Sequence, residues 1–421
     1  MSDIVPKGWK VVRLGQILSE SRIPIGYDDP ARRISVRLHL QGVHKRDERA
    51  TDTVGSTTHF KRFHGQLIYG KQNLHNGAVG VIPKHLDGFG SSQDIPAFDI
   101  YDGFSVSWLF QYISRYEYYK GLEKIASGTG SKRIQPSSLF KERVLAPPLL
   151  EQQKIAAILS SVDDVIEKTR AQIDKLKDLK AGLMQELLTK GAGLDGAPHT
   201  AFKNSPVGQI PDDWEVVPLV DLCSKISVGI ASSTTHAYAQ KGVPILRNQN
   251  ILEGSIRATD MLHISQQFSD ENASKKIREG DVLTVRTGYP GVSAIVPKEF
   301  DGCHSFTTLI SRPKKGELDP GYLALLINSD YGKKFVVGGQ AGGAQQNLNA
   351  TTLKTFPVIL PSLDEQAEIF DIVNSVSSKI VCIEKKYRSL VSAKKALMQD
   401  LLTGKVRVNV YKDEAAAALS A

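Results

Sequence analysis

The sequence predicts an α+β protein built by internal duplication, with two globular parts and two long helices that pair as an antiparallel coiled coil. Two observations predict this fold class: short sequence blocks recur at a fixed offset along the 421 residues, and a heptad pattern follows each globular part. The expected segments are a globular part over 1–148, a helix over 149–190, a linker over 191–205, a globular part over 206–362, a helix over 363–403 and a tail over 404–421.

The duplication is visible in three pairs of matching blocks. Pro147-Pro-Leu-Leu-Glu-Gln152 recurs as Pro361-Ser-Leu-Asp-Glu-Gln366, and the Leu-Met-Gln-(Glu/Asp)-Leu-Leu-Thr block at 183 recurs at 397, both at an offset of 214. The openings of the two copies, which share a Pro-x-x-Trp-x-Val-Val-x-Leu pattern, match at an offset of 205. The second copy therefore holds nine extra residues before position 297. This period is far longer than a solenoid repeat and indicates a duplicated half.

Each globular part mixes strand and helix patterns. Apolar runs bounded by Gly, Pro and Asp predict strands over 67–69 and 78–82 in the first copy, and over 282–285 and 292–296 in the second. A helix is expected over 108–119, with its counterpart over 322–331. The strands and helices do not alternate regularly, which favours α+β over a doubly wound sheet.

Each copy ends in a helix with an apolar seam that steps by four and three residues, the coiled-coil period. Lysines interrupt both seams at the same step, Lys180 and Lys394. An amphipathic helix on a globular core is the alternative, but it predicts a drifting 3.6-residue period and a shorter run. The seam residues are Ile155, Leu159, Val162, Ile166, Ile173, Leu176, Leu183 and Leu187 in the first helix, and Ile369, Val373, Val376, Ile380, Ile383, Tyr387, Leu390, Leu397 and Leu401 in the second.

The helix boundaries agree with local chemistry. Pro147 and Pro361 favour an extended entry to each helix, and Gly191 and Gly404 follow the last seam residues, where a helix end needs a positive φ. A short strand is expected after the second helix, over 406–410, where apolar and polar residues alternate.

Composition narrows the class of protein. Three cysteines without a C-x-x-C pair exclude a disulfide framework and a thiolate zinc site. There is no apolar stretch of 18 residues and no apolar leader, so we expect a cytoplasmic protein without a membrane partner. The net charge of +8 is uneven: residues 1–150 hold 21 basic and 14 acidic side chains, whereas 206–362 hold 15 of each. Excess positive charge favours a polyanionic partner.

No catalytic or metal-binding motif is found, so we expect neither a catalytic residue nor a metal ligand in this chain. Polar and basic residues in loop-like segments of both copies are instead candidate DNA contacts, because Lys and Arg suit phosphates and guanine edges while Asn and Gln suit adenine edges. These candidates are Arg37, His39, Lys45, Arg46, Lys71, Lys132, Arg133, Gln135, Arg247, Asn248, Asn250, Arg286, Gln345, Gln346 and Asn347.

These motifs together resemble the specificity (S) subunit of type I restriction–modification systems. The resemblance rests on the Leu-x-Glu-Gln entry to each helix, the repeated helix exit, the Pro-x-x-Trp opening of each copy and the duplication. It implies that the globular parts are target recognition domains, each binding one half of a split, asymmetric site in double-stranded DNA, and that the paired helices set the spacer.

The resemblance also implies partners and cofactors that lie outside this chain. The helices would dock two modification subunits, which bind S-adenosylmethionine and methylate adenine at N6, and added restriction subunits would use ATP and Mg²⁺. No cofactor is expected on the chain itself. Two alternatives stay open at this stage: a self-contained DNA methyltransferase or nuclease, and a non-catalytic structural protein with a coiled-coil spacer.

Overall fold

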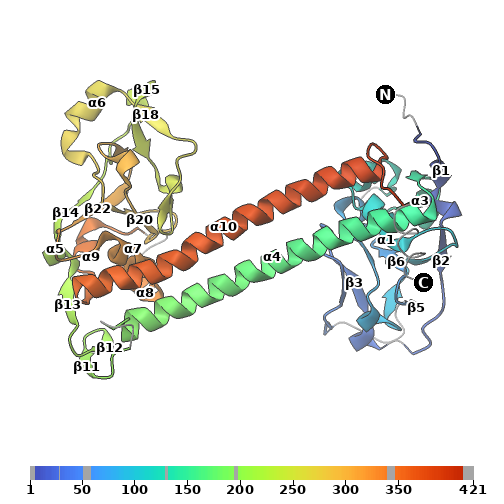
Figure 1. Cartoon of the computed structure of the whole chain (residues 1–421), viewed down its shortest axis with the longest axis horizontal. Helices are drawn as coiled ribbons and strands as arrows, with labels where there is room; N and C mark the ends of the chain where they lie inside the picture. Colours follow the sequence, from blue (N-terminus) through green and yellow to red (C-terminus); the bar gives the residue numbers. More distant parts are fainter. Residues whose placement is uncertain are drawn as a thin grey trace, which may run out of the picture. The chain divides into compact units, whose positions relative to one another are not determined.

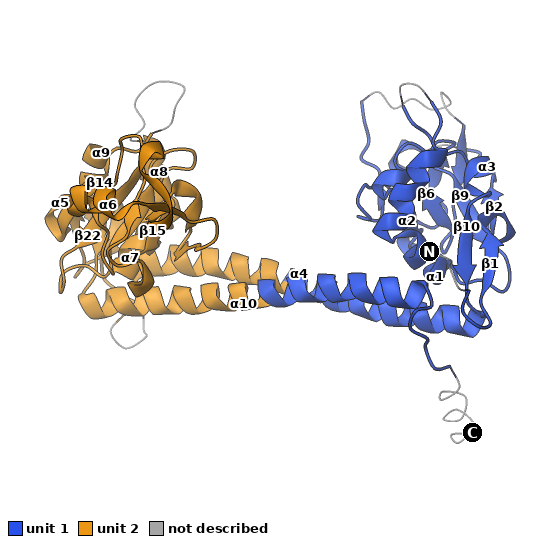
Figure 2. Cartoon of the chain, turned by 90° about the horizontal axis from the view of Figure 1, so that it is seen from above, with its two compact units in different colours: residues 1–171, 384–421 blue, residues 172–383 orange. Residues whose placement is uncertain are grey.

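The computed structural model describes residues 5–27, 29–50, 58–128, 131–193, 198–338 and 347–410. The chain forms two compact units (Figures 1 and 2). Unit 1 comprises residues 1–171 and 384–421, and unit 2 comprises residues 172–383. Each long helix is therefore shared between the units, whereas the sequence segments treated each helix as separate from the globular parts.

Unit 1 holds ten strands, three short helices and one part of each long helix in its described residues. The strands are β1 (Lys10–Arg13), β2 (Leu18–Ser21), β3 (Ile34–Val36), β4 (Val43–Lys45), β5 (His59–Lys61), β6 (Leu67–Tyr69), β7 (Val79–Val81), β8 (Gly90–Ser92), β9 (Ala97–Ile100) and β10 (Arg143–Ala146). The short helices are α1 (Val106–Ile113), α2 (Tyr116–Gly121) and α3 (Pro136–Leu139).

Unit 2 has the same plan with more strands. They are β11 (Phe202–Ser205), β12 (Gly208–Pro211), β13 (Glu215–Pro218), β14 (Cys223–Val228), β15 (Tyr238–Leu246), β16 (Ile251–Leu252), β17 (Ser255–Ile256), β18 (Leu262–Ile264), β19 (Val282–Val285), β20 (Ser293–Ile295), β21 (His304–Ser305), β22 (Thr308–Pro313) and β23 (Pro357–Leu360). Its short helices are α5 (Leu219–Leu222), α6 (Gln266–Glu271), α7 (Pro320–Asn328), α8 (Asp330–Gly338) and α9 (Ala350–Lys354).

Each unit contains its own four-stranded antiparallel sheet, and the two sheets have equivalent strand orders. The order is β2-β9-β6-β7 in unit 1 and β14-β22-β19-β20 in unit 2. A separate antiparallel pair joins a strand near the start of each globular part to the last strand of that part, β1 with β10 and β13 with β23. The α+β duplication predicted from the sequence is therefore confirmed.

The nine extra residues of the second copy lie between β14 and β19. Strand β14 begins 205 residues after β2, whereas β20 begins 214 residues after β7. In this interval unit 2 has β15 and β18, which form a three-stranded sheet with the later β21, and the β16–β17 hairpin, whereas the described residues of unit 1 form the pairs β3–β4 and β5–β8. The insertion thus enlarges the globular part of unit 2 without changing the strand order of its four-stranded sheet.

The long helices are α4 (Leu149–Lys190) and α10 (Leu363–Leu402), close to the predicted bounds. The predicted seam residues are all buried or half-buried in both helices. In unit 1, Ile155 and Leu159 share a core with Leu401, and in unit 2, Leu187 shares a core with Ile369 and Val373. The start of one helix thus meets the end of the other in each unit, which is antiparallel pairing. The same apolar clusters include the sheet residues, which explains why each helix end belongs to a unit.

The structure differs from the sequence expectations at three places. The helices expected over 108–119 and 322–331 are each broken into two, α1–α2 and α7–α8. The second break occurs because Ser329 has an extended ψ and its hydroxyl accepts from the N–H of Gly332, starting a new helix. The strand expected over 406–410 is absent; Arg407 there forms side-chain contacts instead.

A buried glutamate attaches each long helix to its globular part. In unit 1, the indole N–H of Trp9 donates to Glu151 (3.0 Å), and Arg407 donates to both oxygens of the same carboxylate (2.7 and 2.8 Å). In unit 2, the indole N–H of Trp214 donates to Glu365 (2.9 Å). The Trp of the opening motif therefore binds the Glu of the Leu-x-Glu-Gln motif in both copies.

The next residue of the motif, a glutamine, makes a second attachment. The side-chain oxygen of Gln152 accepts from the backbone N–H of Ser105, at the start of α1, and its amide donates to the carbonyl of Pro147. Gln366 repeats this arrangement with Asp319, at the start of α7, and with Pro361. We call the set Trp9, Glu151 and Gln152 the joint of unit 1, and Trp214, Glu365 and Gln366 the joint of unit 2.

The segment that follows the other helix completes each joint. In unit 2, one oxygen of Glu365 accepts from the backbone N–H groups of Ala192 and Gly193 (3.0 and 3.1 Å) and lies 2.9 Å from Nε2 of His199. Part of the predicted 191–205 linker is thus an ordered element of the joint. Gly191 is required there, because its φ is +77° and a Cβ would collide with Glu365 and His199.

Candidate nucleic-acid interface

Three predicted contact segments of unit 1 converge at the end of β6. The N–H of Ile134 donates to the carbonyl of Lys71 (2.8 Å), which joins the segment after β6 to the 131–135 loop. The N–H of His39 donates to the carbonyl of Asn76 (2.9 Å), so the turn between β3 and β4 also rests on the loop after β6. We call residues 37–42, 70–77 and 131–135 the unit 1 loop cluster.

The equivalent segments of unit 2 converge in the same way. The N–H of Leu348 donates to the carbonyl of Arg286 (3.0 Å), and Asn347 forms a bridge with Thr287. The side-chain amide of Asn248 donates to the carbonyl and hydroxyl of Thr287 (3.2 and 2.9 Å). We call residues 247–250, 286–291 and 347–349 the unit 2 loop cluster. The duplication therefore extends from the sheet to the loops that it carries.

The unit 1 loop cluster is basic, and two of its charges are already paired with exposed acids. Lys132 forms an ion pair with Glu123 (2.7 Å), and Arg133 forms one with Asp94 (3.3 Å). The hydrogen bond from Lys132 lowers the pKa of Glu123, with the positive charge of Lys132 as the second cause. Exposed pairs of this kind contribute little stability, so a phosphate can replace either carboxylate at small cost.

The unit 2 loop cluster is more buried and has unused hydrogen-bonding capacity. Nε of Arg247, Oδ1 of Asn248 and Nε of Arg286 are buried and have no hydrogen-bond partner among the described residues. Buried polar groups are nearly always paired. The unit 2 loop cluster therefore holds three buried polar atoms whose hydrogen bonding the described residues leave incomplete.

The other predicted contacts lie elsewhere or carry other roles. Lys45 and Arg46 lie at the opposite end of the β3–β4 hairpin from the 37–42 turn, outside the unit 1 loop cluster. Gln135 is half-buried and precedes α3, where its carbonyl accepts from Ser138. Gln345 and Gln346 lie outside the described residues.

The structure argues against the predicted DNA contact by Asn250. Its side chain is 0% exposed, accepts from the N–H of Arg247 and donates to the carbonyls of Arg257 and Thr259. All its hydrogen-bonding capacity thus serves to hold two loops together, and a base edge has no access to it. The sequence pattern Arg-Asn-x-Asn could not distinguish this inward side chain from Asn248.

We therefore expect Asn250→Ala to lower the stability of unit 2 rather than its affinity for DNA directly. The loss leaves buried backbone groups unpaired, which costs about 1–3 kcal/mol. Thermal unfolding checks this, with Gln249→Ala, an exposed neighbour, as the control. Wild-type stability of the Asn250 variant would contradict the structural role.

Sequence reasoning missed the two joints, although it had singled out both of their motifs. The signal was the recurrence of Trp and Glu in both copies, but 142 residues separate Trp9 from Glu151, and 151 separate Trp214 from Glu365. No pattern in the sequence says that the two motifs meet. It also missed Thr287, which links Asn248 to the loop after β19.

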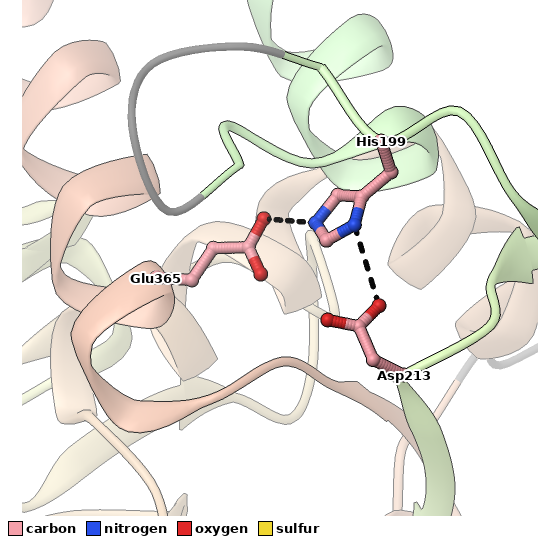
Figure 3. Close-up of side chains that lie close together, drawn as sticks. All are labelled: His199, Asp213 and Glu365. Atoms are coloured by element: carbon pink, nitrogen blue, oxygen red, sulfur yellow. Dashed lines mark hydrogen bonds and ion pairs between the residues drawn. The ribbon is translucent and has the colours of Figure 1, made fainter.

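Beside the joint of unit 2, three side chains of a type that can bind metal lie close together: His199, Asp213 and Glu365 (Figure 3). His199 lies between Glu365 (2.9 Å) and Asp213 (3.3 Å). The Glu365 oxygens, however, already accept from three N–H groups besides that histidine. We therefore assign this cluster a hydrogen-bonding role in the joint.

Among the described residues, no helix combines the length and the apolar character needed to cross a bilayer.

The fold is that of a binding protein with two equivalent domains. Each domain carries a loop cluster of different composition on an equivalent sheet, and both domains are attached to the pair of long helices. The type I restriction modification DNA specificity domain matches the chain twice, over residues 43–178 and 211–391. The chain belongs to this family.

Individual relatives agree with the match. The chain is 30% identical to the type I restriction enzyme MjaVIII specificity subunit of Methanocaldococcus jannaschii, over 68% of this chain and 67% of the relative. It is 22% identical to the EcoBI specificity subunit of Escherichia coli, over 68% of this chain and 62% of that one. The predicted resemblance to S subunits is confirmed.

A solved structure supports the fold. The S subunit of a type I restriction–modification system from M. genitalium matches 94% of this chain and 96% of its own length, with a TM-score of 0.61 and 14% sequence identity. At that identity the likeness concerns the architecture alone.

Proposed function

We propose that the chain is the DNA-reading subunit of a type I restriction–modification complex, and that each unit reads one half of a bipartite, asymmetric site. The observation that carries this proposal is the pair of equivalent loop clusters with different polar groups. Equivalent placement makes both clusters readers, and different side chains make the two half-sites different in sequence.

The proposal includes partners that act on the bound DNA. Two modification subunits docked on α4 and α10 would bind S-adenosylmethionine and methylate adenine at N6, and restriction subunits would add ATP- and Mg²⁺-dependent functions. The chain itself would be non-catalytic and would act in the cytoplasm. Methyl transfer by the purified chain without any partner would instead support a self-contained methyltransferase.

Mapping N6-methyladenine tests the proposal most directly. In DNA from cells that carry this chain and its cognate modification subunit, we expect one two-part sequence with a constant spacer. Cells that lack only this chain are the control and should not contain that methylated sequence. A contiguous methylated site, or none that depends on this chain, would overturn the proposal.

Lys132→Ala and Arg133→Ala should each weaken DNA binding. We expect a loss of about 1–3 kcal/mol if the side chain reads a base, and a smaller loss with a salt slope reduced by about one if it contacts a phosphate. Binding across a salt series separates the two cases. Lys141→Ala, an exposed lysine that is neither a candidate contact nor part of the loop cluster, is the control and should bind as wild type. If both test variants keep wild-type affinity and slope, these residues are ordinary surface.

A further inference from the structure

The joint of each unit lies where a long helix meets the globular part, so it can fix the orientation of that globular part on the helix. Glu151 and Glu365 lie in the first turn of α4 and α10, and Trp9 and Trp214 lie just before β1 and β13. One hydrogen bond in each unit therefore connects a helix to the start of a globular part.

The joints are buried and directional. Glu151 is 3% exposed and Glu365 is 1% exposed, and each carboxylate accepts several N–H donors. A buried carboxylate is costly unless such donors surround it, so the arrangement tolerates little change in angle. The apolar contacts beside the joints, such as Ile155 and Ile369, bury area without a preferred direction.

Gln152 and Gln366 restrict rotation of each long helix relative to its globular part. Gln152 binds the N–H at the start of α1, and Gln366 binds the N–H at the start of α7, so each long helix is bonded to a second element of its own unit. Two attachment points on different elements prevent the rotation that a single hydrogen bond would permit. Within each unit, the long helix is therefore bonded to the globular part at two separate elements.

We propose that the joints determine how strictly the complex demands one spacer length, with Glu151 and Glu365 as positioning residues. This inference rests on the proposed function. A bipartite site is methylated only when both loop clusters meet their half-sites together. A joint that bends would let a unit reach a half-site displaced by one base pair, at the cost of alignment at the correct spacing.

The two joints differ in one way that the test can use. Arg407, a partly exposed side chain, supplies donors to Glu151 in unit 1, whereas backbone N–H groups of Ala192 and Gly193 supply them to Glu365 in unit 2. Arg407→Ala therefore weakens one joint while leaving the Trp9 bond in place. No single side-chain truncation removes the backbone donors in unit 2.

The experiment uses the full chain reconstituted with its modification subunits and S-adenosylmethionine. Methylation rates are measured on duplexes that carry the mapped site with its natural spacer, one base pair more, and one base pair fewer. Glu365→Gln places an amide opposite N–H donors and disturbs the joint of unit 2. Asp364→Asn removes the adjacent, exposed carboxylate of the same helix turn and is the matched control.

We expect Glu365→Gln to reduce the preference for the natural spacer by about tenfold or more, since displacements of ~1 Å can change rates by ~100-fold. Discrimination against base changes within each half-site should stay as in wild type, which a general loss of structure would not allow. Asp364→Asn should keep the wild-type spacer preference. Arg407→Ala should relax the preference in the same direction, and it covers the case in which Glu365→Gln fails to fold.

Wild-type spacer preference in folded complexes of Glu365→Gln, or of Arg407→Ala where the first variant does not fold, would overturn the role of the joints. A wild-type complex that methylates no bipartite site would instead overturn the proposed function. The two failures are therefore distinguishable.

Discussion

Exchanging residues 1–146 for the equivalent segment of a relative should change one half of the methylated sequence and leave the other half and the spacer unchanged. All three segments of the unit 1 loop cluster lie within this segment. The exchange also moves β1 and β10 together, so their antiparallel pairing is kept within one parent. The junction falls between β10, which ends at Ala146, and α4, which begins at Leu149.

The reciprocal exchange of residues 206–360 is the control and should change only the other half-site. Mapping N6-methyladenine reads both outcomes. The donor segment must supply its own tryptophan at the position of Trp9, because the joint with Glu151 would otherwise be lost. A change in both halves after a single exchange would contradict independent reading by the two units.

Removing one heptad from both long helices should shorten the spacer. The ion pair between Asp163 and Lys394 shows which residues face each other, so the deletions are residues 164–170 of α4 and 387–393 of α10. Seven residues span about 10 Å of helix, and a base pair rises about 3.4 Å, so we expect a spacer shorter by about three base pairs. Each apolar seam keeps its phase because the deletion equals one heptad, and the two helices stay matched because facing heptads are removed from both.

The shortened protein should also methylate its new site more slowly. Three base pairs rotate one half-site by about 100° around the DNA axis, whereas a heptad leaves the helix orientation nearly unchanged. Deleting the heptad from α4 alone is the control; it shortens α4 by about 10 Å while α10 keeps its length, so the start of one helix can no longer meet the end of the other in both units, and methylation should be lost. An unchanged spacer after the paired deletion would show that the helices do not set it.

The long helices could be predicted closely because their information is local. The four-three spacing of Ile155, Leu159 and the later seam residues repeats over many turns, and the prolines and glycines at both ends define the bounds. The buried or half-buried state of these residues follows from the same period. The strands over 67–69 and 282–285 were also predictable, as short apolar runs between turn residues.

The sequence predicted which polar and basic residues lie in the loops, but it could not predict where each of these side chains points. Asn248 and Asn250 have the same chemistry two residues apart, yet one bonds Thr287 in the loop cluster and the other is fully buried between loops. Likewise Lys45 and Lys132 are both exposed lysines of unit 1, but only Lys132 belongs to the cluster. Which way a loop side chain points depends on contacts with distant segments, and a single sequence carries no signal for them.

The sequence by itself determined that this protein is a duplicated α+β chain with two heptad helices, because repeats and periods are properties of residue order. Only the tertiary structure decided that Trp9 meets Glu151 and Trp214 meets Glu365, and that the candidate segments gather into one loop cluster in each unit. The physical reason is that a buried carboxylate and its donors are brought together by packing across more than 140 residues. Hydrogen-bond partners at that separation are selected by the fold and leave no local pattern in the chain.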